Sequence, residues 1–373
     1  MSTAIVALTM PQWGLTMTEG KVAEWLKPEG AVLAPGDELV EIETSKITNA
    51  MEVEQPGVLR RIVAQAGDTL PVGALLAVIA EAGVPDAEID RFVAGFVAPA
   101  PVAETETEAA AAPAMLEGAF GRLRYLEAGS GPGVPVVLLH GLGADLGGWM
   151  FTQPALAEGR RVVALDLPGH GGSDKDVGPG DPARFIDAIA DALDRLGIDR
   201  AHLVGHSLGG AIAAGLARRR PERVAGLTLI APAGVAPEIN DAFIQGFVQA
   251  TRRKDAAAVL ALLVYHPALV SRSMVEDVLR YKRLDGVAEA LARIARVWFP
   301  GGRQAHLLAA EAAAGGVRMQ VIWGREDRVI PAAQAAALAS AERHVLEGAG
   351  HLPHMEKAGE VNRLIARFLA AGA

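Results

Sequence analysis

The chain has 373 residues, 51% hydrophobic and 21% charged, which is typical of a folded protein with room for two domains. Its net charge of −9 argues against binding to nucleic acid or to an anionic membrane. The sequence contains no cysteine, which excludes disulfides, thiolate metal ligands and a cysteine nucleophile. No secretory signal and no membrane-spanning stretch is recognisable, so we expect a cytoplasmic protein.

Residues 1–82 contain an internal repeat. Its glycines suit turns, and its apolar residues have the spacing of strands. We predict an all-β domain of two small antiparallel sheets facing each other, a flattened barrel with one tight turn near residues 43–49. The residues that recur at an offset of 37 positions are Gly20, Val22, Trp25, Gly30, Gly36, Leu39 and Ile42, matched by Gly57, Leu59, Ile62, Gly67, Gly73, Leu76 and Ile79.

The predicted turn contains a lysine, Lys46. The region resembles the lipoyl domains of 2-oxo acid dehydrogenase complexes, whose lysine lies at a hairpin tip within a Glu-Thr-Asp-Lys-like sequence; here Ser45 replaces the aspartate. Biotin carrier domains share the fold, but their lysine is usually flanked by methionines, and Met51 is too distant. The resemblance implies that Lys46 carries lipoic acid. The alternative is an ordinary exposed lysine.

Residues 83–114 are predicted to be a short helical segment followed by a linker. Ile89, Phe92, Val93 and Phe96 fall on one helical face. This helix either packs on one of the two domains or docks a partner enzyme. Residues 98–114 are mainly alanine, proline and glutamate, with too little apolar surface to fold, and indicate an extended tether.

Residues 115–373 alternate between short apolar strands and helical stretches. This order predicts a mostly parallel sheet with helices on both faces, where chemistry gathers at the carboxyl ends of the strands. A mainly helical insertion at about residues 235–316 is predicted to form a cap. The expected strands are Pro135–Leu139, Arg161–Leu165, His202–Val204, Leu227–Ile230, Met319–Trp323 and Arg343–Leu346.

Ser207 is the predicted nucleophile. It lies in Gly-His-Ser-Leu-Gly-Gly, between a strand ending at Val204 and a helix beginning near Ala211. This Gly-x-Ser-x-Gly pattern in a strand–turn–helix context resembles the nucleophile elbow of the α/β-hydrolase family. The glycines are needed because the backbone turns sharply there.

The resemblance to α/β-hydrolases also implies the other triad members. Asp327 follows the strand that ends at Trp323 and is expected to be the acid, with Glu326 as its rival. His351, in Gly-Ala-Gly-His, is expected to be the base, and His354 a packing residue. The order serine, acid, histidine is the one that this fold uses.

The oxyanion hole is expected to use two backbone N–H groups, those of Leu208 and Leu142. The resemblance implies that His140 and His206 shape the site rather than react, and that His170 belongs to a structural loop. No histidine pair has metal-ligand spacing with supporting carboxylates, so we predict no catalytic metal. Basic residues of the cap are candidates for the coenzyme A phosphates, although solvated helix faces are the simpler explanation; these are Arg252, Arg253, Lys254, Arg280, Lys282, Arg283, Arg293 and Arg296.

The two modules together resemble the acetyltransferase components of acetoin dehydrogenase complexes. This resemblance implies that acetyl passes from lipoyl-Lys46 to coenzyme A through the triad. The implied partners are a thiamine-diphosphate-dependent acetoin-cleaving component and dihydrolipoamide dehydrogenase. The His-x-x-x-Asp-Gly motif usual in related acyltransferases is absent, because Tyr281 stands at the histidine position before Asp285-Gly286.

Two alternatives remain open at this stage. The chain is either a carrier-linked hydrolase acting on an ester, a thioester or a carbon–carbon bond, or a scaffold whose hydrolase-like domain only binds. The first alternative predicts turnover with water, without dependence on coenzyme A. The second predicts that loss of Ser207 has no effect.

Overall fold

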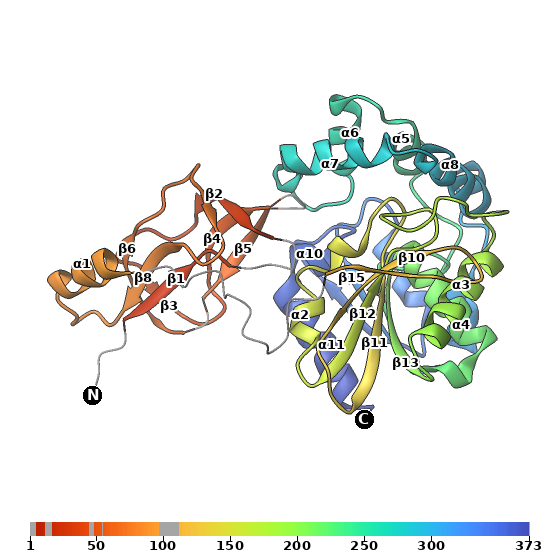
Figure 1. Cartoon of the computed structure of the whole chain (residues 1–373), viewed down its shortest axis with the longest axis horizontal. Helices are drawn as coiled ribbons and strands as arrows, with labels where there is room; N and C mark the ends of the chain where they lie inside the picture. Colours follow the sequence, from red (N-terminus) through yellow and green to blue (C-terminus); the bar gives the residue numbers. More distant parts are fainter. Residues whose placement is uncertain (1–4, 12–16, 45–47, 54, 97–111, 373) are drawn as a thin grey trace. The chain divides into compact units, whose positions relative to one another are not determined.

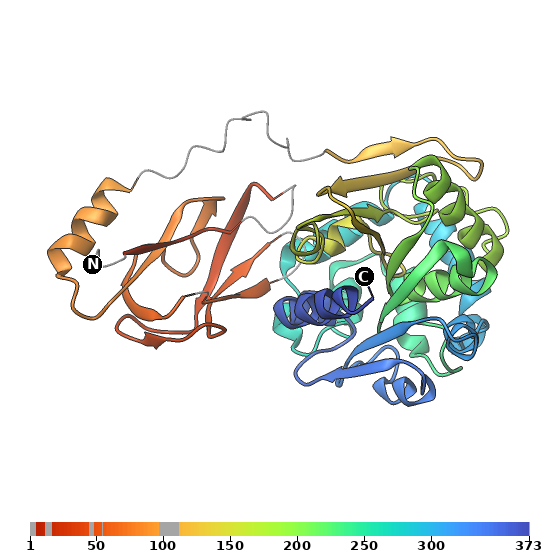
Figure 2. The ribbon, with the colours of Figure 1, turned by 90° about the horizontal axis from the view of Figure 1, so that it is seen from below.

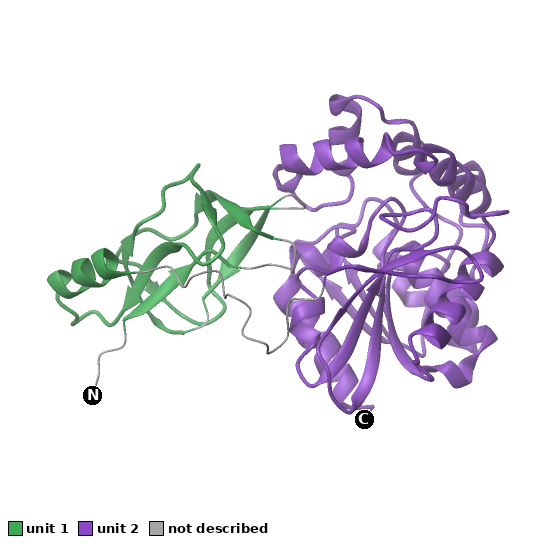
Figure 3. Ribbon diagram, in the orientation of Figure 1, with its two compact units in different colours: residues 1–110 green, residues 111–373 purple. Residues whose placement is uncertain are grey.

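The computed structural model describes residues 5–11, 17–44, 48–53, 55–96 and 112–372. The chain divides into two compact units, residues 1–110 and 111–373 (Figure 3). We call them the carrier unit and the hydrolase unit. In the described part of the chain, no helix is both long enough and apolar enough to cross a membrane.

The carrier unit consists of two four-stranded antiparallel sheets, as predicted (Figure 1). Matching β2, β3 and β4 with β6, β7 and β8 reproduces the offset of 37 residues, and pairing β1 with β5 converts one sheet order into the other. The sheet orders are β1 (Val6–Thr9), β8 (Leu75–Ala80), β6 (Gly57–Ile62), β3 (Val32–Leu33), and β5 (Thr48–Glu52), β4 (Glu38–Glu43), β2 (Glu19–Trp25), β7 (Thr69–Pro71).

Most of the repeat residues have the roles that their types predict, but the glycine pair Gly20 and Gly57 lies in strands β2 and β6 rather than in turns. The apolar ones form a core shared by both sheets, in which Val22, Leu39, Ile42, Leu59 and Leu76 are fully buried. Four of the glycines have a left-handed backbone, which residues with a Cβ adopt only at a cost. Their φ angles are 86° at Gly30, 89° at Gly36, 100° at Gly67 and 83° at Gly73.

The predicted attachment lysine falls in the sequence between strands β4 and β5. The last described pair of this ladder joins Glu43 to Thr48. Lys46 therefore belongs to the short connection between two paired strands, although it lies outside the described residues.

Helix α1 (Asp86–Gly95) packs on the carrier unit. Ile89 is fully buried beside Val78 and Val84. Two ion pairs of 2.7 Å join the helix to strand β6. They are Arg60–Asp86 and Arg61–Asp90. Of the two alternatives for this segment, packing on a domain is therefore the one observed.

The hydrolase unit is built on an eight-stranded sheet, in which every expected parallel strand is present (Figure 2). β9 and β10 run antiparallel to their neighbours and extend the sheet at one edge, which the sequence analysis did not foresee. The order is β16 (Glu342–Leu346), β15 (Met319–Gly324), β14 (Val224–Ile230), β13 (Ala201–His206), β11 (Gly133–Leu139), β12 (Arg160–Leu165), β10 (Leu123–Ala128) and β9 (Ala114–Leu116).

Helices cover both faces of this sheet (Figures 1 and 2). One face carries α3 (Pro182–Arg195), α4 (Leu208–Arg219) and α9 (Leu308–Ala314), and the other α2 (Gln153–Leu156), α10 (Pro353–Glu356) and α11 (Ala358–Ala370). Between β14 and β15, four further helices lie beyond the carboxyl ends of the strands, where the cap is predicted (Figure 1). They are α5 (Asp241–Gln249), α6 (Arg253–Leu260), α7 (Arg272–Lys282) and α8 (Val287–Trp298).

Candidate active site

Ser207 lies in the turn between β13 and α4, in a backbone conformation rarely seen outside glycine. Its φ and ψ are 52° and −117°. The turn is held on both sides: the Ser207 N–H donates to the carbonyl of Ile230, and its own carbonyl accepts from the N–H of Ala233, both at 3.0 Å. Strained residues of this kind cost about 1–3 kcal/mol and persist where the surrounding structure enforces them, often at functional sites.

The glycines that flank Ser207 are required by lack of space. A Cβ at Gly205 would lie 2.5 Å from the carbonyl oxygen of Gly209. A Cβ at Gly209 would lie 2.2 Å from the carbonyl oxygen of Leu139. Neither glycine has a positive φ, so crowding by backbone rather than chain conformation explains the Gly-x-Ser-x-Gly pattern here.

Asp327 and His351, on the loops after β15 and β16, are in direct contact. The His351 Nδ1–H donates to Asp327 Oδ2 at 2.8 Å, and both side chains are buried. The carboxylate also accepts from Trp323 Nε1 and from the N–H groups of Val329 and Ile330, at 2.8–2.9 Å. Because a carboxylate only accepts, the hydrogen is on Nδ1, and Nε2 keeps the lone pair that a base needs.

The two rival residues are occupied elsewhere. Glu326 Oε2 accepts from the N–H of Ala349 at 3.2 Å. His354 is buried in α10, where its ring packs against Trp149 at 4.8 Å. The structure thus brings together Asp327 and His351 and leaves Glu326 and His354 in supporting positions.

His206 connects the nucleophile turn to the histidine loop. It directly precedes Ser207, and its Nε2–H donates to the carbonyl of His351 at 2.9 Å. Its ring lies 4.8 Å from that of His351 and 4.7 Å from that of His354. Burial lowers the pKa of His206 well below its usual value and that of His354 to about 3. Both are therefore neutral and place no positive charge beside His351.

The predicted oxyanion donors lie on two elements that converge near Ser207. Leu208 opens α4, so its N–H has no acceptor within the helix. The other loop approaches so closely that a Cβ at Gly141 would lie 3.1 Å from Ser207 Cβ. His140 Nδ1–H donates to the carbonyl of Gly141 at 2.8 Å. Because a trans peptide points C=O and N–H in opposite directions, this bond turns the Leu142 N–H away from His140.

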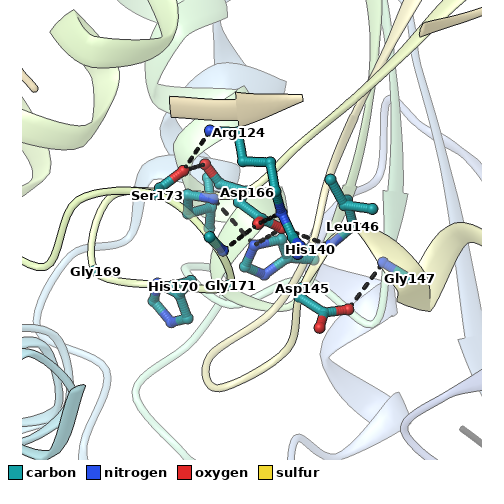
Figure 4. A network of polar contacts seen from close by, with 12 residues as sticks. Arg124, His140, Asp145, Leu146, Gly147, Asp166, Gly169, His170, Gly171 and Ser173 are labelled. Atoms are coloured by element: carbon teal, nitrogen blue, oxygen red, sulfur yellow. Dashed lines mark hydrogen bonds and ion pairs between the residues drawn. The ribbon is translucent and has the colours of Figure 1, made fainter. Parts of the chain in front are cut away.

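A buried carboxylate, Asp166, supports this loop from behind (Figure 4). It accepts from the N–H groups of Leu146 and Gly172, both at 2.7 Å, and from Arg124 Nε at 2.5 Å. Burial raises the pKa of Asp166, and Arg124 opposes this effect. His170, in the loop that begins at Asp166, donates from Nδ1 to the carbonyl two residues before it, and burial lowers its pKa to about 3. These contacts agree with the structural role expected for His170.

Comparison with known proteins agrees with this architecture. The α/β hydrolase fold family matches residues 134–358, and a family described as biotin-requiring enzymes matches residues 6–79. A dihydrolipoyllysine-residue acetyltransferase component of an acetoin cleaving system from Pseudomonas putida is 46% identical over 98% of both chains. Its counterpart from Cupriavidus necator is 44% identical over 99% of this chain and 98% of its own. The chain belongs to this acetyltransferase family.

The hydrolase unit also resembles hydrolases of known structure. A meta-cleavage product hydrolase from Pseudomonas fluorescens superposes with a TM-score of 0.64 and 27% identity, over 70% of this chain and 98% of the other. The alignment thus spans about as much of the chain as the hydrolase unit, and the carrier unit is what the acetyltransferase family adds.

Most of the basic cap residues considered for coenzyme A have partners within the protein. Lys282 donates to three backbone carbonyls at the end of α5. Among the described residues, Lys254, Arg283 and Arg296 have neither an ion-pair nor a side-chain hydrogen-bond partner. Throughout the described residues, no group of three or more histidine, aspartate and glutamate side chains is placed to hold a metal ion. The remaining pairs are Arg252–Asp255, Arg253–Glu276, Arg280–Asp277 and Arg293–Glu289.

Sequence reasoning missed the contacts that join the cap to the catalytic loops. Glu356 accepts from the N–H of Tyr265 in the cap at 2.6 Å and from that of Gly350 in the histidine loop at 2.9 Å. Arg328, next to Asp327, donates to the carbonyl of Val264 at 2.7 Å. Burial raises the pKa of Glu356 to about 7. The two contacts with the cap join a backbone group to a side chain 91 and 64 residues away, so no local sequence pattern predicts them.

Proposed function

We propose that the protein transfers an acetyl group from lipoyl-Lys46 to coenzyme A, with Ser207, Asp327 and His351 as its catalytic triad. The observation that carries the proposal is the buried 2.8 Å contact between Asp327 and His351, beside the strained serine turn and in one chain with a lipoyl-type carrier. Membership of the acetyltransferase family supports the same reaction.

The carrier unit fits lipoic acid. Lys46 occupies the connection between β4 and β5, whose ladder is paired as far as Glu43 and Thr48. When attached, lipoic acid supplies a thiol that carries acetyl as a thioester. A covalent arm on a tethered unit raises the effective concentration of the acetyl group at Ser207.

The triad then moves the acetyl group in two steps. His351 Nε2 removes the proton of the Ser207 hydroxyl, and Ser207 Oγ attacks the thioester carbonyl. The carbon–sulfur bond breaks, and His351 returns the proton to the departing sulfur. In the second step His351 deprotonates the coenzyme A thiol, whose sulfur attacks the acetyl-serine. Acetyl-coenzyme A leaves, and the proton returns from His351 to Ser207.

Two backbone N–H groups, those of Leu208 and Leu142, stabilise the oxyanion in both steps. Each such donor is worth about 3 kcal/mol in the transition state. Asp327 holds His351 in the productive tautomer and stabilises the imidazolium that forms. Lys254, Arg283 and Arg296 are the described basic residues of the predicted coenzyme A set that remain available for its phosphates.

Repeated turnover with acetoin requires two other enzymes in one complex. A thiamine-diphosphate-dependent component cleaves acetoin and acetylates the lipoyl arm, and dihydrolipoamide dehydrogenase reoxidises that arm. The relatives are themselves components of a cleaving system, which supports such a complex. A cytoplasmic location stays a prediction.

Hydrolysis is the second candidate function. The resemblance to a meta-cleavage product hydrolase favours it, because that enzyme uses the same fold without a carrier unit. Under this alternative water, rather than coenzyme A, receives the acyl group.

The deciding experiment measures acetyl-coenzyme A formed from acetyl-dihydrolipoamide by the wild type and by Ser207→Ala. We expect formation that depends on coenzyme A and falls by about 10³-fold or more in the variant, as for other triad nucleophiles. Acetate release that ignores coenzyme A would establish the hydrolase instead. Unchanged transfer by Ser207→Ala would exclude Ser207 as the nucleophile, and would leave either direct transfer with His351 as the base or only a binding role for the hydrolase unit.

A rapid-quench experiment separates the two-step route from direct transfer. With radiolabelled acetyl-dihydrolipoamide and no coenzyme A, the two-step route predicts label on Ser207. Absence of label on Ser207, in a protein that still transfers acetyl to coenzyme A, would mean that His351 activates coenzyme A for direct attack.

A further inference from the structure

Two phenylalanine side chains of α5 border the reaction centre. Phe243 and Phe247 lie one helical turn apart, with ring centroids 5.9 Å from each other. Both are buried, at 4% exposed each. The ring of Phe243 lies 6.4 Å from that of His351. The ring of Phe247 lies on the oxyanion loop, against Gly143. Helix α5 therefore faces both the proposed base and the loop that carries one proposed oxyanion donor, Leu142.

The contact at Gly143 shows how little space Phe247 leaves. A Cβ at Gly143 would lie 2.1 Å from Phe247 Cε1 and 2.2 Å from its Cζ. Gly143 directly follows Leu142, whose N–H is a proposed oxyanion donor. The acyl carbon must lie between that donor, Ser207 and His351. An acyl group longer than acetyl would therefore contact one of the two rings.

Both ends of α5 are held in place. At its start, Asn240 Nδ2 donates to the carbonyl of Arg328 at 2.7 Å, and the Asn240 N–H donates to the carbonyl of Val329 at 2.9 Å. Those two residues directly follow Asp327. At its end, Lys282 donates to the carbonyls of Phe247, Val248 and Ala250, and its Nζ lies 5.4 Å from the ring centroid of Phe247.

We infer that Phe243 and Phe247 form a fixed wall that restricts the acyl group to acetyl. The inference rests on the proposed function and names the substrate class of the same site. A wall held at both ends cannot move aside cheaply for a longer chain. In apolar pockets one methylene is typically discriminated by about 10–200-fold, so several methylenes give strong selection.

The test uses the full-length protein, coenzyme A, and thioesters of dihydrolipoamide that carry an acetyl, butanoyl or hexanoyl group. Release of dihydrolipoamide is measured by chromatography, and kcat/KM for hexanoyl is divided by that for acetyl. We expect this ratio to rise at least about tenfold in Phe247→Ala and in Phe243→Ala. Phe247→Leu, which keeps more of the packing, is expected to give a smaller rise.

Phe299→Ala is the matched control. Phe299 is also a buried phenylalanine, 2% exposed, and it directly follows cap helix α8. Its ratio should stay at the wild-type value. Lys282→Met keeps both phenylalanine side chains but removes the donor that holds the end of α5. The wall can then move, and the ratio should rise several-fold. Thermal melting of every variant shows that the compared proteins are folded.

The outcomes separate this inference from the proposed function. Folded Phe247→Ala and Phe243→Ala variants with the wild-type ratio would overturn the wall. A higher ratio only in Phe299→Ala would also overturn it. Release of dihydrolipoamide reports transfer to coenzyme A and to water alike. Loss of coenzyme A dependence would therefore overturn the acetyltransferase while the ratio still tests the wall.

Discussion

Turns of the carrier unit and the nucleophile turn of the hydrolase unit use glycine for different physical reasons. In the carrier unit, Gly30, Gly36 and Gly67 have left-handed φ angles, and a Cβ at any of them would meet no atom within 4 Å. In the hydrolase unit, Gly205 and Gly209 have ordinary φ angles but no room for a Cβ. These three carrier turns thus need glycine for chain conformation, whereas the nucleophile turn needs it for the approach of one backbone to another.

The units also differ in what they bury. Among the described residues of the carrier, the buried polar side chains are the two threonines Thr44 and Thr48. The hydrolase unit buries Asp166, His206 and His351, together with most of Glu356. Stability of the carrier should therefore depend on turns and apolar packing, whereas that of the hydrolase unit should also depend on pH. Three substitutions test this difference.

Gly209→Ala should have the largest effect. Gly209 is the second residue of α4, where helix propensity alone predicts that alanine stabilises by about 1 kcal/mol. The added Cβ, however, would lie 2.2 Å and 2.5 Å from the carbonyl oxygens of Leu139 and His140. Overpacking of this kind costs about 1–3 kcal/mol. Displacement of the adjacent nucleophile turn should lower kcat by about 100-fold.

Denaturant unfolding and acetyl-transfer kinetics of Gly209→Ala measure these effects. Gly315→Ala serves as the control, because Gly315 ends a helix with a negative φ and its Cβ would come no closer than 3.3 Å to another atom. A Gly209→Ala protein as stable and as active as the wild type would show that the crowding at the turn is relieved by small shifts.

The parts of the molecule that the sequence predicted are those encoded locally. A set of glycines and apolar residues recurs once, 37 positions later, and this repeat sufficed to predict both carrier sheets. Ser207, Asp327 and His351 each lie in a short motif at a strand end, so each was predicted from its own motif through the resemblance to α/β-hydrolases. Their proximity then follows from the parallel sheet, which gathers the strand ends at one edge.

The parts that the sequence did not predict depend on distant partners. Asp166 pairs with Arg124 across 42 residues, and Glu356 accepts from the N–H of Tyr265 across 91. Neither pair leaves a periodic pattern in the sequence, and the partner of Glu356 is a backbone N–H, a group that every residue except proline has. The placement of Phe243 over His351 likewise depends on how the cap packs, and the sequence predicted only that a cap exists.

Glu356→Gln should have the next largest effect, and it depends on pH. Burial raises the pKa of Glu356 from 4.5 to about 7, although three N–H groups, those of Tyr265, Gly350 and Leu352, oppose the shift, and the negative charge of Asp327 adds to it. The folded protein therefore holds this proton more tightly than the unfolded chain. Its contribution to stability is complete below pH 4.5 and is lost as the pH rises through about 7.

The measurement is the free energy of unfolding of the wild type and of Glu356→Gln between pH 4.5 and 8. The wild type should lose at most about 3 kcal/mol over this interval through Glu356, and the variant should lack that loss. Glu360→Gln, on the exposed side of α11, is the matched control and should follow the wild type. A variant with the full wild-type pH dependence would assign the loss of stability to other groups.

Gly36→Ala, in the carrier, should have the smallest effect. Its φ of 89° places an alanine in the left-handed region, which costs about 1–2 kcal/mol, and no atom within 4 Å adds to that cost. Gly36→Asn should cost less, because asparagine visits this region more readily. Melting of the carrier unit in the full-length protein measures both, and acetyl transfer from free acetyl-dihydrolipoamide should be unchanged. If asparagine costs as much as alanine, space rather than conformation limits this turn, and the difference between the two units does not hold there.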